Sequence, residues 1–214
     1  MTKQEFVAKI LSSRKPNLLD NAPIPLRKNE AEGGCGVIGI ACSEKIAARH
    51  LLQALVQMRN RGNGKGGGIA AVGLIPEELG VSKEVLEMDY LMSIAYLDSE
   101  CREEVEHKYI EPKFEIDHIR YAPRIDDFRS IKGLDVKPPE VYTYFVRVRP
   151  EAVREFKEKN NLDINTGLPS QSIEDEIIYQ NTYCLNREFY SSTGETRAFV
   201  LSHGKNMLVF KMVG

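Results

Sequence analysis

The sequence changes character abruptly at residue 35. Residues 16–34 contain three prolines and end in a glycine pair, a composition typical of a linker. Residues 35–42 then form a short apolar run, which predicts a buried strand. Apolar residues at helical spacing follow over 45–60, a glycine-rich run ends that helix, and residues 69–75 predict a second strand. We therefore expect a strand, a helix and another strand directly after the linker.

Ahead of the linker, residues 4–13 place Phe6, Val7, Ile10 and Leu11 on one helical stripe. This spacing predicts a short amphipathic helix. For residues 16–34, the alternative to a linker is an ordinary unstructured terminus, which is common among proteins.

Strand and helix patterns alternate through the rest of the chain. A turn containing Gly204 and Asn206 separates two apolar runs, 198–201 and 207–211, and this arrangement predicts a C-terminal hairpin. The mixture favours an α/β or α+β fold. Strands are predicted at 86–97, 113–121 and 140–148, helices at 99–109, 150–160 and 172–187, and loops at 122–138 and 161–171.

Charge and composition exclude several classes of protein. A net charge of −2 over 214 residues gives no reason to expect nucleic acid or an anionic membrane as a partner. No run of eighteen apolar residues occurs, so no membrane-spanning helix is expected. The four cysteines show no C-x-x-C spacing, so we expect neither a disulfide framework nor a metal site, and a reducing cytoplasm is the default location.

Cys35 is the cysteine whose neighbours indicate more than packing. Glycines flank it on both sides, and glycine allows the backbone to approach a ligand closely. Cysteines are more often small buried hydrophobes, and that is our interpretation of Cys42, Cys101 and Cys184.

Other motifs are less informative. In the glycine-rich run Lys65 precedes Gly66 rather than Ser or Thr, so the run is not a phosphate-binding P-loop; a helix end followed by close strand packing is the simpler interpretation. His118 lies on a predicted strand and His203 in the predicted turn, and we expect His203 at the surface.

Three stretches together resemble a known family. They are Cys-Gly-Val-Ile-Gly-Ile at 35–40, Leu-Gln-Ala-Leu at 52–55, and the Arg-Gly-Asn-Gly turn at 61–64 with the glycines at 66–68. This combination resembles the start of class II glutamine amidotransferases, which are N-terminal-nucleophile hydrolases, and residues 202–214 resemble a hairpin of their glutamate-synthase branch. The resemblance implies an α+β fold, the four-layer αββα sandwich, with residues 35–214 forming an N-terminal part that is incomplete at its C-terminal end.

The implied chemistry is hydrolysis of glutamine. In the family a cysteine thiolate attacks the side-chain amide, ammonia leaves, and water hydrolyses the glutamyl thioester. The base is the α-amine of the same cysteine, which titrates at about 7.7–8.0 and so suits proton transfer near neutral pH. Cys35 can supply that amine only if residues 1–34 are a propeptide that is cut between Gly34 and Cys35.

The resemblance also implies supporting residues and partners. Arg61 and Gly62 match the arginine–glycine turn that lies near the nucleophile, where a cation favours thiolate; the alternative for Arg61 is an arginine facing a helix end. The family's substrate-clamp and oxyanion motifs do not occur in the sequence, and His118-Ile-Arg120-Tyr121 is a partial match in the wrong order. We expect glutamine as substrate, the remaining amidotransferase segment and synthase subunits or domains as partners, and no cofactor in this chain.

Two alternatives remain. The chain is either an amidotransferase part completed elsewhere or a non-catalytic subunit or regulatory module that keeps the fold without a complete site. A thiol hydrolase unrelated to the family is a third, weaker hypothesis.

Overall fold

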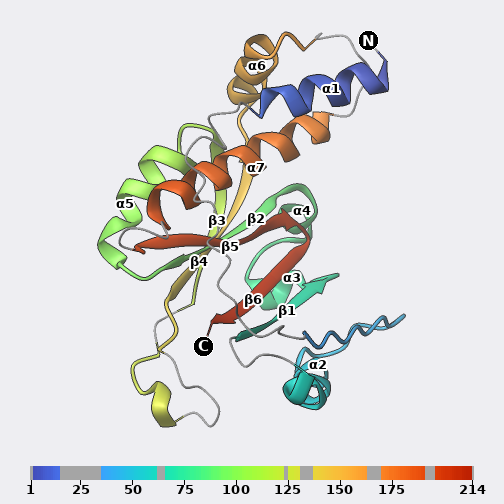
Figure 1. Cartoon of the computed structure of the whole chain (residues 1–214), viewed down its shortest axis with the longest axis vertical. Coiled ribbons are helices and arrows are strands. Elements are labelled where there is room, and N and C mark those ends of the chain that lie inside the picture. Colours follow the sequence, from blue (N-terminus) through green and yellow to red (C-terminus); the bar gives the residue numbers. More distant parts are fainter. Residues whose placement is uncertain are drawn as a thin grey trace, which may run out of the picture.

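The computed structural model describes residues 2–14, 35–61, 66–122, 125–130, 137–162, 170–190 and 196–213. These residues form an α+β structure with two antiparallel sheets, one of four strands and one of two. Figure 1 shows the four-stranded sheet with helices packed along it, and the two-stranded ribbon below it. Among the described residues no helix is long and apolar enough to cross a membrane.

The larger sheet has the strand order β3-β4-β2-β5, and every neighbouring pair is antiparallel. β2 lies between two strands and is buried along its whole length, as its apolar sequence Tyr-Leu-Met-Ser-Ile-Ala-Tyr requires. The predicted strands at 113–121 and 140–148 are confirmed. The four strands are β2 (Tyr90–Tyr96), β3 (Phe114–Ala122), β4 (Glu140–Val148) and β5 (Ala198–Lys205).

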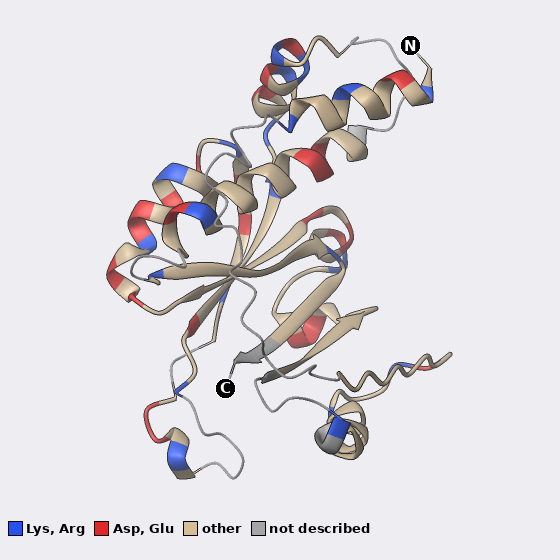
Figure 2. Ribbon diagram, in the orientation of Figure 1, with Lys and Arg blue, Asp and Glu red and all other residues tan. Residues whose placement is uncertain are grey.

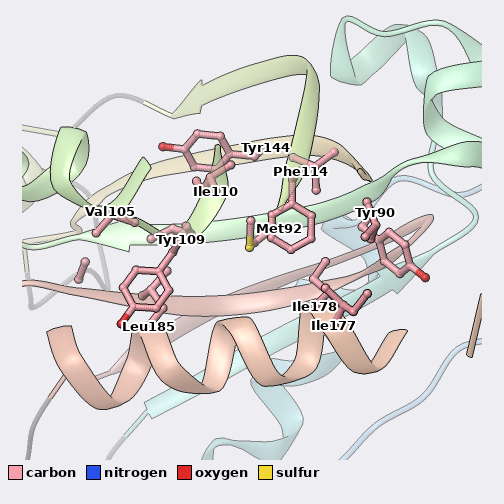
Figure 3. Close-up of a cluster of buried hydrophobic side chains, with 14 of the residues drawn as sticks. Tyr90, Met92, Val105, Tyr109, Ile110, Phe114, Tyr144, Ile177, Ile178 and Leu185 are labelled. Atoms are coloured by element: carbon pink, nitrogen blue, oxygen red, sulfur yellow. The ribbon is translucent and has the colours of Figure 1, made fainter. Parts of the chain in front are cut away.

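Helices cover one face of this sheet, and the predicted helices there are confirmed. The main core lies between the sheet and α7, where Met92, Phe114 and Tyr144 meet Ile178 and Leu185 (Figure 3). The elements on this face are α1 (Lys3–Ser13), a continuous helical stretch formed by η3 (Ser99–Cys101), α5 (Arg102–Val105) and η4 (Glu106–Ile110), α6 (Pro150–Lys159) and α7 (Ser170–Phe189).

Two short helices cover part of the opposite face, α3 (Pro76–Leu79) and α4 (Lys83–Met88). They bring Leu79 and Leu86 against Leu91 and Phe145 of the sheet. The predicted strand at 86–97 is therefore too long, because residues 86–88 belong to α4, whose N-terminus is capped by the side chain of Ser82.

The second sheet is a ribbon of β1 (Gly66–Val72) and β6 (Met207–Val213). The strand predicted at 69–75 is present but lies three residues earlier, and the predicted C-terminal hairpin is wrong. β5 pairs with β2 and β6 pairs with β1, so the chain leaves one sheet and enters the other at Asn206, which adopts a left-handed backbone with φ of 48°. Glycine and asparagine favour such a reversal but do not decide which strand each run pairs with.

A junction at Leu74 joins the ribbon to the rest of the molecule. The Leu74 backbone N–H donates to Oδ1 of Asn206 at 2.9 Å. Its carbonyl oxygen accepts from Nζ of Lys45 at 3.0 Å. Three distant parts of the chain therefore meet at one residue.

The N-terminal helix predicted at 4–13 is confirmed and is docked on the body of the molecule. A capping box between Thr2 and Glu5 starts α1, and Phe6 is buried in the main core. Its last turn reaches α7, where Arg14 forms two hydrogen bonds of 2.8 Å with Glu176. Residues 2–14 are therefore not an unstructured terminus; the linker predicted at 16–34 lies outside the described residues.

Candidate functional site

Cys35 lies at the surface in a segment without regular structure. Its side chain is exposed, and Val37 beside it is 87% exposed. The buried strand predicted at 35–42 is wrong, since none of the described strands pairs with these residues and most of their side chains are exposed. An apolar run is buried only when a neighbouring element covers it.

A close backbone contact holds the start of this segment against the turn that contains Arg61. A Cβ added to Gly36 would lie 2.9 Å from Cβ of Met58 and 3.1 Å from Cβ of Arg61. Only glycine fits at such a distance, whereas Gly39 has no atom within 4 Å of the equivalent position. The backbone directly after Cys35 is thus held against the segment that ends at Arg61.

Arg61 ends the helical segment that follows Cys35. The helix predicted at 45–60 is shorter than expected, comprising α2 (Arg49–Leu55) and the 3₁₀ turn η2 (Val56–Arg61). The Arg61 side chain is exposed. Gly62, the other predicted supporting residue, lies outside the described residues.

The glycine-rich entry to β1 is loosely packed at Gly67. Gly67 pairs with Met212 across the ribbon, and a Cβ added to Gly67 would meet nothing within 4 Å. The expectation that these glycines serve close strand packing is therefore wrong at Gly67.

The remaining cysteines fall into two groups. Cys42 is exposed, like Cys35, while Cys101 is buried and Cys184 partly so. Burial raises the pKa of the Cys101 thiol, which makes it a poor nucleophile. The expectation of a buried small hydrophobe is confirmed for Cys101 and wrong for Cys42.

His118 and His203 both lie on strands of the larger sheet, in different surroundings. His118 on β3 stands edge-on to Phe145, with ring centroids 5.5 Å apart. His203 lies within β5 rather than in a surface turn, and burial lowers its pKa. The expectation of a surface position for His203 is wrong because β5 extends to residue 205.

The sequence did not reveal a hollow beside α7. A cavity of about 520 Å³ is lined by residues of α1, α7, β2 and β5, among them Tyr90, Asp175, Tyr179, His203 and Lys205. Its polar groups largely satisfy one another: the Tyr90 hydroxyl donates to Asp175 at 2.7 Å, and Lys205 Nζ lies 4.6 Å from the Tyr90 ring centre. Neither Cys35 nor Arg61 lines it.

One buried carboxyl stands apart electrostatically. Asp89 is 1% exposed, its carboxylate oxygens have no hydrogen-bond donor, and Arg147 Nε is 4.0 Å away. Burial, with the nearby charge of Asp117, raises the pKa of Asp89 to about 6. Asp117 binds the same arginine directly, which lowers the pKa of Asp117. Within the described part of the chain, no group of three or more His, Cys, Asp or Glu side chains is arranged to hold a metal ion.

Comparison with known proteins adds one distant relative. An uncharacterized protein of Archaeoglobus fulgidus is 24% identical over 183 residues, which is 84% of this chain and 39% of the relative. The chain therefore spans well under half of that protein's length. No family model matches the sequence, and no solved structure matches it.

Proposed function

We propose that this chain is the N-terminal part of a class II glutamine amidotransferase, the glutaminase half of a glutamate-synthase-like enzyme, with Cys35 as nucleophile. The observation that carries the proposal is the contact of Gly36 with the Met58–Arg61 turn. It holds the residue after the exposed Cys35 against the segment that ends at Arg61, which supports a shared site formed by the two motifs on which the resemblance rests.

The chemistry assigns a role to each group. The Cys35 α-amine accepts the thiol proton, and Sγ attacks the carbonyl carbon of the glutamine side-chain amide. Ammonia leaves with that proton, and water cleaves the glutamyl thioester to release glutamate. A cation at Arg61 favours the thiolate. Because the α-amine must be free, the proposal requires cleavage between Gly34 and Cys35.

The two antiparallel sheets are compatible with the αββα sandwich of the family. In this proposal the ribbon of β1 and β6 is the start of one inner sheet, and the four-stranded sheet with its helices is the other half. The exposed side chains Val72 and Phe210 on the ribbon are then positions for further packing.

Labelling with a glutamine-analogue diazoketone tests the proposal directly. The native protein, after its intact mass has been measured to locate its N-terminus, is expected to gain one adduct at Cys35 and to be protected by excess glutamine. Cys42 is the matched control, since it is also an exposed free cysteine seven positions away in the same segment. Cys35→Ala should abolish labelling and Cys42→Ala should not; equal labelling of both cysteines would contradict the proposal.

A second candidate function is a non-catalytic amidotransferase-like subunit. It is favoured by the lack, anywhere in the sequence, of the family's His-Asn-Gly oxyanion stretch and Gly-Asp pair. Loss of one oxyanion donor costs about 10²–10³ in rate. If Cys35→Ala leaves the protein's contribution to its assembled complex unchanged, this second function is the better one.

A further inference from the structure

We infer that helix α1 stays bound after the chain is cut ahead of Cys35, so that the mature protein is a non-covalent pair of residues 1–34 and 35–214. The cleavage itself rests on the proposed function. Hydrolysis of the Gly34–Cys35 bond consumes one water and leaves a carboxylate on Gly34 and a free amine on Cys35. The structure shows, in addition, that helix α1 of the cleaved segment packs on a specific surface of the remaining chain.

Apolar packing supplies the first part of that surface. Phe6 is 6% exposed and belongs to the same buried cluster as Ile173 and Ile177 of α7. Ile10, one turn further along α1, packs against this cluster from its edge. Removal of α1 would open the main core to water at the N-terminal half of α7.

Polar contacts supply the second part and fix the register of the helix. Arg14 grips Glu176 through two hydrogen bonds of 2.8 Å and stacks 4.6 Å from the ring centre of Tyr179. Gln180 donates to the Ser13 hydroxyl at 3.0 Å. At the other side, Lys9 Nζ donates to the Asn161 carbonyl at 2.6 Å.

Glu176 makes dissociation costly. It is 5% exposed, and besides Arg14 it accepts a hydrogen bond from Gln180. If α1 left, a buried carboxylate would lose its cation, which is strongly unfavourable unless the site rearranges. The stability of the body therefore depends on α1 remaining bound.

Helix α1 lies far from the candidate site, so its stabilising role is independent of the chemistry at Cys35. In Figure 1, α1 packs at one end of the molecule, beside α6 and α7, and the segment from residue 35 lies at the other end, near α2. α1 does not cover Cys35. Cutting the chain frees the α-amine, and the docked helix need not leave.

Co-expression of the two pieces tests the inference without relying on natural processing. Residues 1–34 and 35–214, the latter tagged, are produced in one cell and purified through the tag. We expect residues 1–34 to co-purify at one-to-one stoichiometry through gel filtration, as shown by native and denaturing mass spectrometry. Phe6→Ala or Arg14→Ala in the short piece should reduce retention by about tenfold or more. Val7→Ala is the matched control, because Val7 is on the same helix and 46% exposed.

Two outcomes would overturn the inference. One is a folded, monodisperse 35–214 chain that retains none of the short piece. The other is a 35–214 chain that aggregates even when the short piece is supplied, because α1 should then have completed its core. Neither outcome depends on Cys35 labelling, so failure here and failure of the proposed function are distinguishable.

Discussion

The four-stranded body and the region around Cys35 differ in how completely they are packed. In the body, β2 and the facing side of α7 are fully enclosed. Among the described side chains of residues 35–61, 67–72 and 207–210, Leu208 alone is buried. β1 carries no charged residue, and Figure 2 draws the described part of the ribbon in tan, without charged residues. The four-stranded body therefore contains most of the buried core, while the candidate site lies in a region with few buried side chains.

The largest difference should appear in a matched pair of phenylalanine truncations. Phe114 is fully buried and Phe210 is 53% exposed. We expect Phe114→Ala to lower the free energy of unfolding by about 3–5 kcal/mol and Phe210→Ala by about 0.5 kcal/mol or less. Urea unfolding of both variants measures the two values. Similar losses at the two positions would mean that the ribbon is packed as tightly as the body.

A matched pair of glycines separates site geometry from stability. Gly36→Ala forces its Cβ against Met58 and Arg61, whereas Gly39→Ala meets open space. We expect Gly36→Ala to slow labelling of Cys35 by the glutamine analogue about 10–100-fold, because small misplacements of reacting groups cost that much. Gly39→Ala should label at the wild-type rate. The unfolding midpoint of the body should change in neither variant, and a shift would show that the two regions are coupled.

Two ion pairs formed by helical residues, one partly buried and one exposed to solvent, should differ in their contribution to stability. Arg14→Ala leaves the buried Glu176 without its cation and should cost about 1–3 kcal/mol. Lys83→Ala breaks the solvent-exposed pair with Glu87 and should cost about 0.5 kcal/mol or less. Thermal unfolding of the full chain measures both. An equal, small loss would mean that α1 contributes little to the body.

A pH dependence is also expected, and it arises at Asp89. The pKa of its carboxyl rises from 3.8 to about 6 in the fold, so the folded state holds the proton more tightly than the unfolded state. Stability from Asp89 is therefore present below pH 3.8 and is lost as pH rises to about 6, by about 1–3 kcal/mol. Asp89→Asn should remove this component, which is measured as the difference from wild type in urea unfolding between pH 4 and 7. Glu115→Gln, an exposed acid beside the same Arg147, should leave the slope unchanged.

Sequence periodicity predicted the body better than the candidate site. From residue 90 onward, the apolar side chains whose spacing predicted strands and helices are buried against neighbouring elements, as in β2, β4 and α6. The pattern at 35–42 was equally apolar but found no partner strand, so a local signal gave the wrong structure. Pairing was also beyond local reasoning, since β6 joins β1 rather than its neighbour β5.

Long-range contacts explain the remaining misses. Arg14 and Glu176 are 162 positions apart, and no spacing rule connects them. That Arg61 lies near Cys35, in contrast, is what the resemblance implied, and the contact of Gly36 with Met58 and Arg61 is compatible with it. Gly62 and the linker lie outside the described residues.

The junction at Leu74 has a consequence for hydrogen exchange. Its amide hydrogen is held by Asn206, at the point where the chain passes between sheets, and its carbonyl is held by Lys45 from the segment that follows Cys35. Exchange at that amide requires the link between the two sheets to open. The protection factor of this single amide hydrogen thus reports how often the ribbon separates from the body. Amides within β1 and β2 report instead on the opening of their own strands.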